Sequence, residues 1–526
     1  MEVGVIDSGI MENHKYLTQA IKKQHSQSYV HSDSSTADSV KGGGHGTKVA
    51  GAILYPNGLA NLTTPYQLPC FIRNIRVLDS NNSLIHNYPA ELMIKISNNN
   101  SDCKIFNLSI CSNAPHKTGH MSSWAAIIDK LSYEKDLLFL ISAGNISTFD
   151  IKHFLNQGAT YPQYLEEKYC RLANPSQSIF SLSVGSININ NYEDVNWTSI
   201  GGIGEVSPFS RIGTGIWGGI KPDVVEHGGG FIISKNGNNQ IREHESTSPE
   251  LIRSTLHGGS ALGRDSVGTS FTTPKVSYIA AMLKQLYPDE DNNLIRAFIA
   301  QGARLPNEHF RNPSKTSIRY FGYGLPSLER VTKNSEHRIT FYNTGKLKAE
   351  EGHLYSLSIP EEIRGQGDEY DILIEITLAF STKVRRTRQK TKSYLATWLD
   401  WSTSKIGESF EEFKEYALKE IEESKTDYDK DARKVFDTFK WMINDRSDHG
   451  SVQGISRTNS SLQKDWTIMK SYELPNELNI AVRGHKGWDK NKSEVPYALT
   501  VSIEILGSDI PIYESIKIEN EVEIEV

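Results

Sequence analysis

The chain has 526 residues, 37% of them hydrophobic, and its 57 basic and 63 acidic side chains give a formal net charge of −6. A chain of this length exceeds what one hydrophobic core supports, so two or three domains are expected. The mild negative charge argues against nucleic acid as the main partner. The sequence contains no stretch of 18 apolar residues, so no membrane-spanning helix is expected.

The first predicted element is an apolar strand that ends in an acidic residue. In the segment Val5-Ile6-Asp7-Ser8-Gly9, Asp7 closes the strand. Gly9 allows the chain to turn directly after it. Taken alone, a segment of this kind is most often a plain strand and turn. Its significance depends on the motifs that lie further along the chain.

A histidine between two glycines comes next, in Gly44-His45-Gly46-Thr47. The following apolar residues predict a helix over Val49–Tyr55, so His45 lies at its start. The glycines leave room around the imidazole. His is the side chain whose unperturbed pKa suits a general base, although a loop histidine is the simpler interpretation of this motif alone.

A continuous apolar run, Leu137–Ile141, predicts a strand that is buried on both faces. It ends in Ser142-Ala143-Gly144-Asn145. An asparagine after two small residues is also typical of a left-handed turn. The segment therefore stays ambiguous until the rest of the pattern is known.

The last motif is Gly268-Thr269-Ser270-Phe271-Thr272-Thr273-Pro274, which begins a helix continuing through Val276–Leu286. Pro274 lies in the first turns, where a missing N–H costs least. A serine hydroxyl is a weak nucleophile that needs an adjacent base, and a buried carboxylate can orient that base. Asp7, His45 and Ser270 thus supply an acid, a base and a nucleophile in the chain order Asp, His, Ser.

With these motifs, residues 3–333 resemble the subtilisin-like (subtilase) serine peptidases. The resemblance implies hydrolysis of a protein or peptide by an Asp7–His45–Ser270 triad, with no metal or cofactor needed for the chemistry. It also implies that the Asn145 side chain and the Ser270 N–H hold the oxyanion. The implied substrate-binding residues are Asn107, Leu108, Ser109, Ile110, Ser142, Ala143 and Gly144, with residues 107–110 acting as an edge strand.

The sequence departs from this family in two places. Cys111-Ser112 stands where subtilases usually have glycines, and Glu226-His227 stands where Ala-Pro-Gly usually follows the strand. Cys111 is either a small buried hydrophobe or a thiol that narrows the substrate cleft. His227 and His257 are rival histidines, but neither lies at a Gly-His-Gly-Thr helix start.

Residues 1–333 alternate strands with helices such as Ser122–Leu131, which predicts an α/β domain. Its mostly parallel sheet would have helices on both faces and the site at its carboxyl edge. Residues 335–526 predict a β-sandwich of jelly-roll type. Its expected strands are Ile339–Tyr342, Leu354–Ile359, Asp371–Phe380, Thr467–Tyr472, Leu478–Arg483 and Ala498–Leu506.

A helical hairpin over about residues 405–446 is expected to interrupt the sandwich, with helices over Ser409–Ser424 and Asp429–Asn444. Its apolar faces either pack on each other and on the sandwich or dock a partner. The acidic cluster Pro288–Asn292 begins a helix, and capping explains it better than calcium binding.

A basic run follows the third strand of the sandwich. It consists of Lys383, Arg385, Arg386, Arg388, Lys390 and Lys392. The spacing, near two residues with one slip, predicts the charged face of a bulged strand that discourages aggregation. Docking of an acidic partner is the alternative. A role in nucleic-acid binding is disfavoured because no aromatic residue is interleaved before Tyr394 and Trp398.

Four cysteines in this length do not form a disulfide scaffold, and their spacing gives no zinc motif. Sparse cysteine favours the cytoplasm. No signal peptide or folding prodomain precedes Asp7 in the sequence. We therefore expect a processed chain, a shortened chain with an added Met, or an intracellular enzyme without a prodomain.

A narrower resemblance rests on the domain order and on Ser393-Tyr394-Leu395-Ala396-Thr397-Trp398-Leu399-Asp400-Trp401. These features resemble intracellular bacterial subtilases encoded beside an AAA-type ATPase and implicated in plasmid incompatibility and anti-phage defence. The resemblance implies an ATPase partner, and no direct partnership with nucleic acid or membrane is expected. Two alternatives remain: a latent or non-catalytic interaction subunit, and an acyl-transfer enzyme on the same fold.

Overall fold

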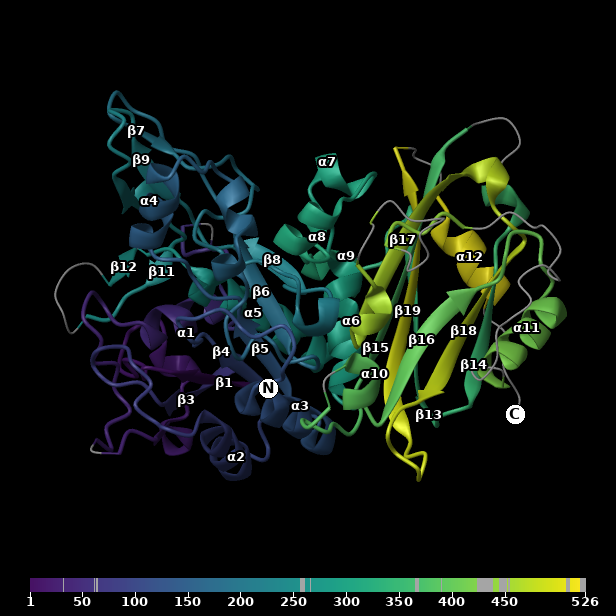
Figure 1. Cartoon of the computed structure of the whole chain (residues 1–526), viewed down its shortest axis with the longest axis horizontal. Helices are drawn as coiled ribbons and strands as arrows, with labels where there is room; N and C mark the ends of the chain where they lie inside the picture. Colours follow the sequence, from purple (N-terminus) through teal and green to yellow (C-terminus); the bar gives the residue numbers. More distant parts are fainter. Residues whose placement is uncertain are drawn as a thin grey trace. The chain divides into compact units, whose positions relative to one another are not determined.

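The computed structural model describes residues 1–31, 33–60, 62, 65–255, 261–264, 266–364, 369–388, 390–422, 439–443, 452, 455–507 and 511–520. The chain forms two compact units (Figure 1). The N-terminal unit comprises Met1–Ile295, Ala303–Pro306 and Thr316–Pro326, and the C-terminal unit comprises Arg296–Gly302, Asn307–Lys315 and Ser327–Val526. The units interleave in sequence between residues 295 and 327. A single domain boundary at residues 333–335 remains a prediction.

The N-terminal unit is built on a seven-stranded sheet in which every pairing is parallel. The strand order is β2 (Gln27–Ser28), β3 (Phe71–Arg76), β1 (Glu2–Asp7), β4 (Ile105–Leu108), β5 (Leu138–Ser142), β6 (Leu182–Ile187) and β8 (Val224–His227). The central strands are almost entirely apolar and buried, as expected of strands covered on both faces.

Helices cover both faces of this sheet. On one face, α2 (Pro89–Asn99) and α3 (Ser123–Lys135) pack in a core with Phe106 and Phe139. On the other, α5 (Thr269–Leu286) lies against β4, where the Ser277 hydroxyl donates to the Asn107 side chain at 3.0 Å. These layers confirm the predicted α/β fold.

The predicted helices over Val49–Tyr55, Ser122–Leu131 and Val276–Leu286 correspond to α1 (Gly46–Leu54), α3 and α5. The acidic cluster also behaves as predicted, because Asp291 accepts bonds from the backbone N–H groups of Asn293 and Leu294 at the start of α6 (Asn292–Gly302). The remaining α-helices and strands described in residues 1–333 are α4 (Thr148–Asn156), β7 (Trp197–Ser199), β9 (Phe231–Ser234), β10 (Ile241–Glu243), β11 (Leu251–Ile252), β12 (Leu262–Gly263), α7 (Asn307–Phe310), α8 (Lys315–Phe321) and α9 (Leu328–Thr332).

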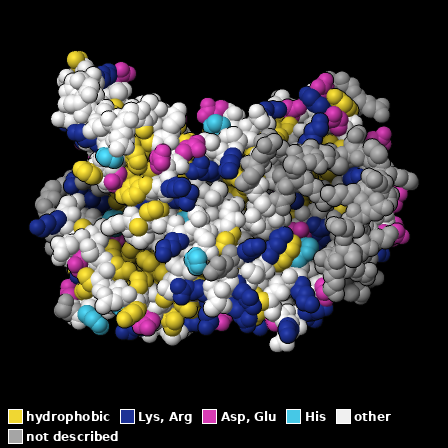
Figure 2. Space-filling view, in the orientation of Figure 1, with side chains coloured by type: hydrophobic (Ala, Val, Ile, Leu, Met, Phe, Trp, Pro, Cys, Tyr) yellow, Lys and Arg dark blue, Asp and Glu magenta, His cyan; other side chains and the backbone are white. Residues whose placement is uncertain are grey.

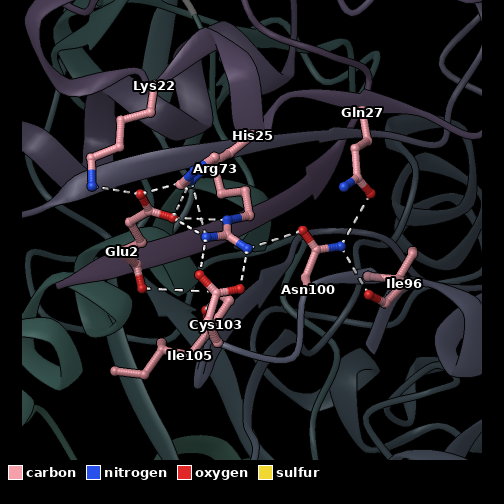
Figure 3. Close-up of polar contacts among 10 residues, drawn as sticks. Glu2, Lys22, His25, Gln27, Arg73, Ile96, Asn100, Cys103 and Ile105 are labelled. Atoms are coloured by element: carbon pink, nitrogen blue, oxygen red, sulfur yellow. Dashed lines mark hydrogen bonds and ion pairs between the residues drawn. The ribbon is translucent and has the colours of Figure 1, made fainter. Parts of the chain in front are cut away.

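An ion-pair cluster ties together the amino-terminal ends of the strands (Figure 3). Arg73, on β3, pairs with Glu2 on β1 and donates to both carboxylate oxygens of Asp102 at 2.7 Å. The bonds from Arg73 lower the pKa of Asp102 to about 2. Lys22 and His25 complete the cluster around Glu2. The guanidinium therefore joins β1, β3 and the segment before β4 at the end of β1 opposite Asp7.

The C-terminal unit contains two antiparallel sheets. One has the order β13 (Arg338–Leu347), β19 (Val495–Leu506), β15 (Asp371–Phe380), β17 (Leu462–Lys470), and the other β14 (Gly352–Ser358), β18 (Glu477–Lys486), β16 (Thr397–Thr403). Side chains join the sheets, since the Trp401 indole donates to the Gln463 carbonyl at 3.1 Å and the Gln463 amide donates to the Leu399 carbonyl at 2.8 Å. The predicted β-sandwich is confirmed.

Strand β16 was not predicted, because its side chains do not alternate between apolar and polar. Asp400 is buried in the middle of it and accepts bonds from Arg483 and His485 of β18. These ion pairs stabilise a carboxylate where a sandwich strand usually has an apolar residue. Arg483 and His485 lie far from Asp400 in the sequence, so the residues around Asp400 do not indicate that it has these partners.

The first predicted helix of the insertion is present as α11 (Phe410–Glu422). Its Phe413 and Ala417 pack against Ala481 and Leu354 of the sandwich, as expected for a structural element. Most of the second predicted helix, Asp429–Asn444, lies outside the described residues. Residues 439–443 are described and are not helical, so the prediction is wrong there.

The predicted charged strand over the basic run is also wrong. Residues 383–392 contain one bridge, Val384 to Leu395, then a turn and the start of α10 (Thr391–Tyr394). The cationic side chains therefore project from a loop and a short helix. A further helix, α12 (Tyr513–Asn520), follows β19. Among the residues with described structure, no helix is long and apolar enough to cross a membrane.

Phe106 is fully buried and stacks on Phe139 with ring centroids 5.3 Å apart. We expect Phe106→Ala to lower the free energy of unfolding by about 3–5 kcal/mol, because it leaves a cavity in the sheet's core. Urea unfolding would measure the change. Phe149→Ala, at a side chain that is 79% exposed, is the control, and equal losses in the two variants would contradict this account of the core.

Candidate active site

The predicted acid and base meet at the carboxyl edge of the parallel sheet. Asp7 is the last residue of β1, and His45 is the residue immediately before α1. His45 Nδ1 lies 2.6 Å from Asp7 Oδ1, a distance typical of a charge-assisted hydrogen bond. The Asp7 side chain is 0% exposed and that of His45 is 16% exposed, so one edge of the imidazole faces the site.

Close packing explains the small residues around this pair. A Cβ on Gly46 would lie 2.2 Å from the Gly9 carbonyl oxygen and 3.2 Å from Asp7 Oδ1. Only glycine allows α1 to begin this close to the strand end. The Ser8 N–H donates to Asp7 Oδ1 at 2.7 Å, and the Ser8 hydroxyl accepts from the Gly46 N–H at 2.9 Å.

The predicted nucleophile, Ser270, is the second residue of α5. Pro274 has no N–H, so the Ser270 carbonyl lacks its usual helical donor four residues later. The Ser109 hydroxyl donates to that carbonyl at 3.0 Å instead. Ser109 in turn accepts from Asn107 at 3.0 Å, so the segment after β4 is tied directly to the nucleophile's helix.

The Ser270 hydroxyl does not bond to His45 in this structure. Its Oγ donates to the Ser109 carbonyl oxygen at 3.4 Å, and no hydrogen bond joins it to the imidazole among the described residues. The imidazole ring instead contacts the Phe271 ring, with centroids 5.7 Å apart. Acid and base are assembled, whereas the nucleophile points to the neighbouring backbone.

Two hydrogen-bond donors beside Ser270 have no acceptor among the described groups. One is the Ser270 N–H, and the other is the side-chain amide nitrogen of Asn145. The Asn145 amide is oriented through its oxygen, which accepts from the Thr269 N–H at 3.0 Å and from the Thr269 hydroxyl at 2.9 Å. A Cβ on Gly268 would lie 3.1 Å from the Asn145 Nδ2, so glycine keeps this donor accessible.

The predicted substrate segment is only partly available. Asn107 and Leu108 belong to β4, whose backbone pairs with β1 on one side and with β5 on the other. The expectation of a free edge is therefore wrong for these two residues, because β4 lies inside the sheet. Strand pairing ends after Leu108, so Ser109–Cys111 lie beyond the paired part of β4.

The second predicted segment, Ser142–Gly144, lies directly beside the first. Ser142 ends β5, Ala143 is buried, and the Gly144 N–H donates to the Thr269 hydroxyl at 3.2 Å. A Cβ on Gly144 would lie 3.1 Å from the Cys111 sulfur. The Cys111 thiol thus occupies the space where segments 109–111 and 142–144 come together.

Arg211 fixes the loops behind this space. It is 1% exposed, and its guanidinium donates only to backbone carbonyl oxygens, with no ion pair among the described residues. The acceptors are those of Asn113 at 2.7 Å, Asn145 at 3.2 Å, Tyr169 at 2.5 Å and Arg171 at 3.0 Å. One buried cation therefore holds the Asn145 backbone and two further segments, at Asn113 and at Tyr169–Arg171, in place.

A second buried carboxylate, Asp38, supports the acid–base pair. Its oxygens accept from the Ser8 hydroxyl at 3.0 Å and from the Thr47 N–H and hydroxyl at 2.9 and 2.8 Å. Burial lowers the pKa of His45, but the charges of Asp7 and Asp38 and the Asp7 hydrogen bond outweigh burial and raise it above its usual value. Protonated His45 is thus stabilised.

Comparison with known proteins assigns the family. Residues 1–324 match peptidase S8, the subtilase family. The chain belongs to this family. It is a subtilisin-like serine peptidase, and the subtilase match covers the β-strands and helices that carry Asp7, His45 and Ser270.

Individual similar proteins are distant. The uncharacterized protein y4bN of Sinorhizobium fredii (strain NBRC 101917 / NGR234) is 30% identical over 314 residues, which cover 57% of this chain and 72% of that protein. A lanthipeptide protease has a TM-score of 0.42 at 18% identity, covering 62% of this chain and 85% of that one. A cold-adapted subtilisin-like serine proteinase has a TM-score of 0.36 at 18% identity, covering 57% and 81%.

The rival histidine His227 forms no hydrogen bond with Asp7 or Ser270 among the described residues. His227 ends β8, where its ring nitrogen is 3.3 Å from the Asn188 carbonyl oxygen, and His257 lies outside the described residues. Sequence reasoning missed Asp38 and Arg211. Neither stands in a motif, and each acts through partners that only the fold brings near. Thr269, which orients the Asn145 side chain, could have been identified from the sequence because it is next to Ser270 in the same motif.

Asp38→Asn should move the acid limb of activity to lower pH. Neutral His45 is the base, so activity falls as pH drops through the His45 pKa, and removal of one of the two nearby carboxylates lowers that pKa. The rate of Ser270 labelling by a fluorophosphonate, followed against pH, measures the limb. Asp33→Asn, at an exposed loop carboxylate paired with Arg76, is the control. An acid limb unmoved by Asp38→Asn would contradict this role.

Proposed function

We propose that this chain is a serine endopeptidase in which Asp7, His45 and Ser270 form the catalytic triad. The observation that carries the proposal is the 2.6 Å contact between buried Asp7 and His45, at an edge where Asn145 and the Ser270 N–H offer unused donors. A carboxylate, an imidazole, a hydroxyl and two donors are the groups that acyl transfer requires.

The reaction follows from the position of each group. Ser270 Oγ attacks the scissile carbonyl carbon and its proton passes to His45 Nε2, while Asp7 stabilises the imidazolium that forms. The oxyanion accepts hydrogen bonds from Asn145 and from the Ser270 N–H. His45 then protonates the leaving amine, and a water molecule activated by His45 hydrolyses the acyl-enzyme.

An extended peptide is the substrate that fits the edge. The backbone of Ser109–Cys111, beyond the end of β4, is placed to pair with such a peptide by strand addition. Asn107, Leu108 and Ile110 would act by supporting this segment. Ser142, Ala143 and Gly144 would form the facing side of the site.

A latent resting state is the second candidate, and one observation favours it. The Ser270 hydroxyl bonds to the Ser109 carbonyl at 3.4 Å, so it must rotate before His45 can take its proton. Substrate or a partner would drive this rotation by occupying Ser109–Cys111. An AAA-type ATPase acting in anti-phage defence is such a partner, and the resemblance of residues 393–401 to ATPase-linked subtilases supports it.

A cytoplasmic location belongs to the same proposal. All four cysteines, Cys70, Cys103, Cys111 and Cys170, are free. Free thiols are the normal state in reducing compartments.

Labelling with a fluorophosphonate probe tests the catalytic proposal. We expect the chain to be labelled and Ser270→Ala to be unlabelled. Asn145→Ala should retain the triad but lose about 100- to 1000-fold in labelling rate or peptide turnover, because one oxyanion donor is removed. Asn156→Ala, at an exposed amide outside the site, is the control. Labelling that persists in Ser270→Ala would disprove the assignment of the nucleophile.

Cys111 should restrict the side chain that precedes the cleaved bond. Its sulfur fills the space beside Gly144, so small residues such as Gly, Ala and Ser are expected there. Cys111→Gly should raise kcat/KM for Phe or Leu at this position relative to Ala by about tenfold, because removing Cβ and Sγ frees the volume of about two methylene groups. Peptide-library cleavage measures the ratio, with Cys170→Ala as the control. An unchanged ratio would refute the steric role.

A further inference from the structure

The C-terminal unit carries a concentration of positive charge that the proteolytic chemistry does not use. Nine lysine and arginine side chains lie in two segments, residues 383–392 and 485–493, together with one acidic residue, Asp489. All nine are exposed. They are Lys383, Arg385, Arg386, Arg388, Lys390, Lys392, Lys486, Lys490 and Lys492, here called the basic surface.

The fold makes these two distant segments one surface. The Trp488 indole donates to the Tyr394 carbonyl at 3.0 Å, and the Lys383 ammonium donates to the Ser493 hydroxyl at 2.9 Å. Antiparallel pairing of β16 with β18 also places Trp398 opposite His485. In Figure 2, dark-blue side chains gather around the place that α10 occupies in Figure 1.

Aromatic rings underlie two of the cations. The Arg385 guanidinium lies 4.2 Å from the centre of the Trp488 ring, and the Lys392 ammonium lies 4.2 Å from that of Trp398. In the sequence, aromatic residues are absent from the basic run itself, which disfavours nucleic-acid binding. The structure removes that objection, because Trp488 comes from the segment after β18, far from the run in sequence.

A buried network holds this arrangement in place. Asp400 accepts from His485 at 2.8 Å, and the His485 ring stacks on Trp398 with centroids 3.8 Å apart and planes 10° apart. Lys392 covers the indole of Trp398. The order from Asp400 outward is therefore carboxylate, imidazole, indole and ammonium. Such support lowers the conformational entropy that a cation loses when it binds an anion.

The charges are largely available to a ligand. Lys492 pairs with Glu350. In contrast, Arg388, Lys390, Lys486 and Lys490 form no ion pair with any described residue. In a chain whose formal net charge is −6, this uncompensated local charge is not a general property of the surface. It creates a local positive potential that attracts polyanions.

We propose that the basic surface binds nucleic acid through its phosphate backbone, without reading base sequence. A phosphate chain presents closely spaced negative charges, which match the density of cations here. Three of the cations are arginines, whose planar guanidinium suits phosphate. Surfaces for single strands often include arginine in cation–π contact, and Arg385 lies over Trp488 here. Binding would localise the peptidase on nucleic acid, a function beyond peptide hydrolysis.

Fluorescence anisotropy of a labelled single-stranded oligonucleotide tests this proposal. The full chain with Ser270→Ala is used, so that self-cleavage is removed. The reversal variant adds Arg388→Glu, Lys390→Glu and Lys490→Glu. The matched control adds Lys315→Glu, Lys333→Glu and Lys414→Glu, which are exposed lysines elsewhere in the C-terminal unit with the same total charge change.

We expect the parent and the control to bind at about 50 mM salt and the reversal variant to bind about tenfold more weakly or worse. The salt slope, about −0.7 for each phosphate contact with a single strand, should be shallower in the reversal variant. If that variant fails to fold by circular dichroism, glutamine at the same three positions replaces it.

Three results would overturn the proposal. The first is that the parent does not bind the oligonucleotide at low salt. The second is that the reversal and control substitutions weaken oligonucleotide binding equally. Competition by poly-glutamate as effective as that by unlabelled oligonucleotide, at equal charge, is the third. It would assign the surface to an acidic protein instead.

Discussion

A single buried carboxylate constrains the geometry of the site. Asp7 is removed from solvent at the end of β1, and an isolated charge there would be strongly unfavourable. The Asp7 carboxylate is stabilised by hydrogen bonds from the Ser8 N–H and from His45, whose Nδ1 lies 2.6 Å away. If the imidazole turned away, the buried negative charge would lose this hydrogen bond in a low-dielectric environment. Gly46 follows from the same constraint, because a side chain there would separate the helix from the strand.

The remaining groups reach the site through equally specific supports. Pro274 removes one helical hydrogen bond, and Ser109 replaces it, which links the nucleophile's helix to the substrate segment. Arg211 performs a comparable task on the other side by binding the backbone of Asn145. Parallel strands bring these segments to one edge because their carboxyl ends coincide. The site is thus a property of the whole sheet, and the Ser270 hydroxyl is the one group still to be aligned.

The sequence predicts structure that is local and periodic. The buried strands of the parallel sheet are continuous apolar runs, so they could be recognised. The helices after His45 and Ser270 and six strands of the sandwich could be recognised from their periodic patterns. Interactions between distant residues could not. Asp400 in β16, the cations of residues 383–392 and the buried Asp38 depend on partners that only the fold brings close. For the same reason the supposed free edge at Asn107 and Leu108 proved to be the interior of the sheet.

Proton NMR of His45 tests the central constraint most directly. A strong bond from Nδ1–H to a buried carboxylate moves the proton resonance far downfield of the backbone amides. We expect one such resonance in the folded chain and in Ser270→Ala, and its loss in Asp7→Asn, in which the carboxylate is replaced by an amide. A folded chain without this resonance, or one that keeps it in Asp7→Asn, would contradict the account in which Asp7 fixes the catalytic base.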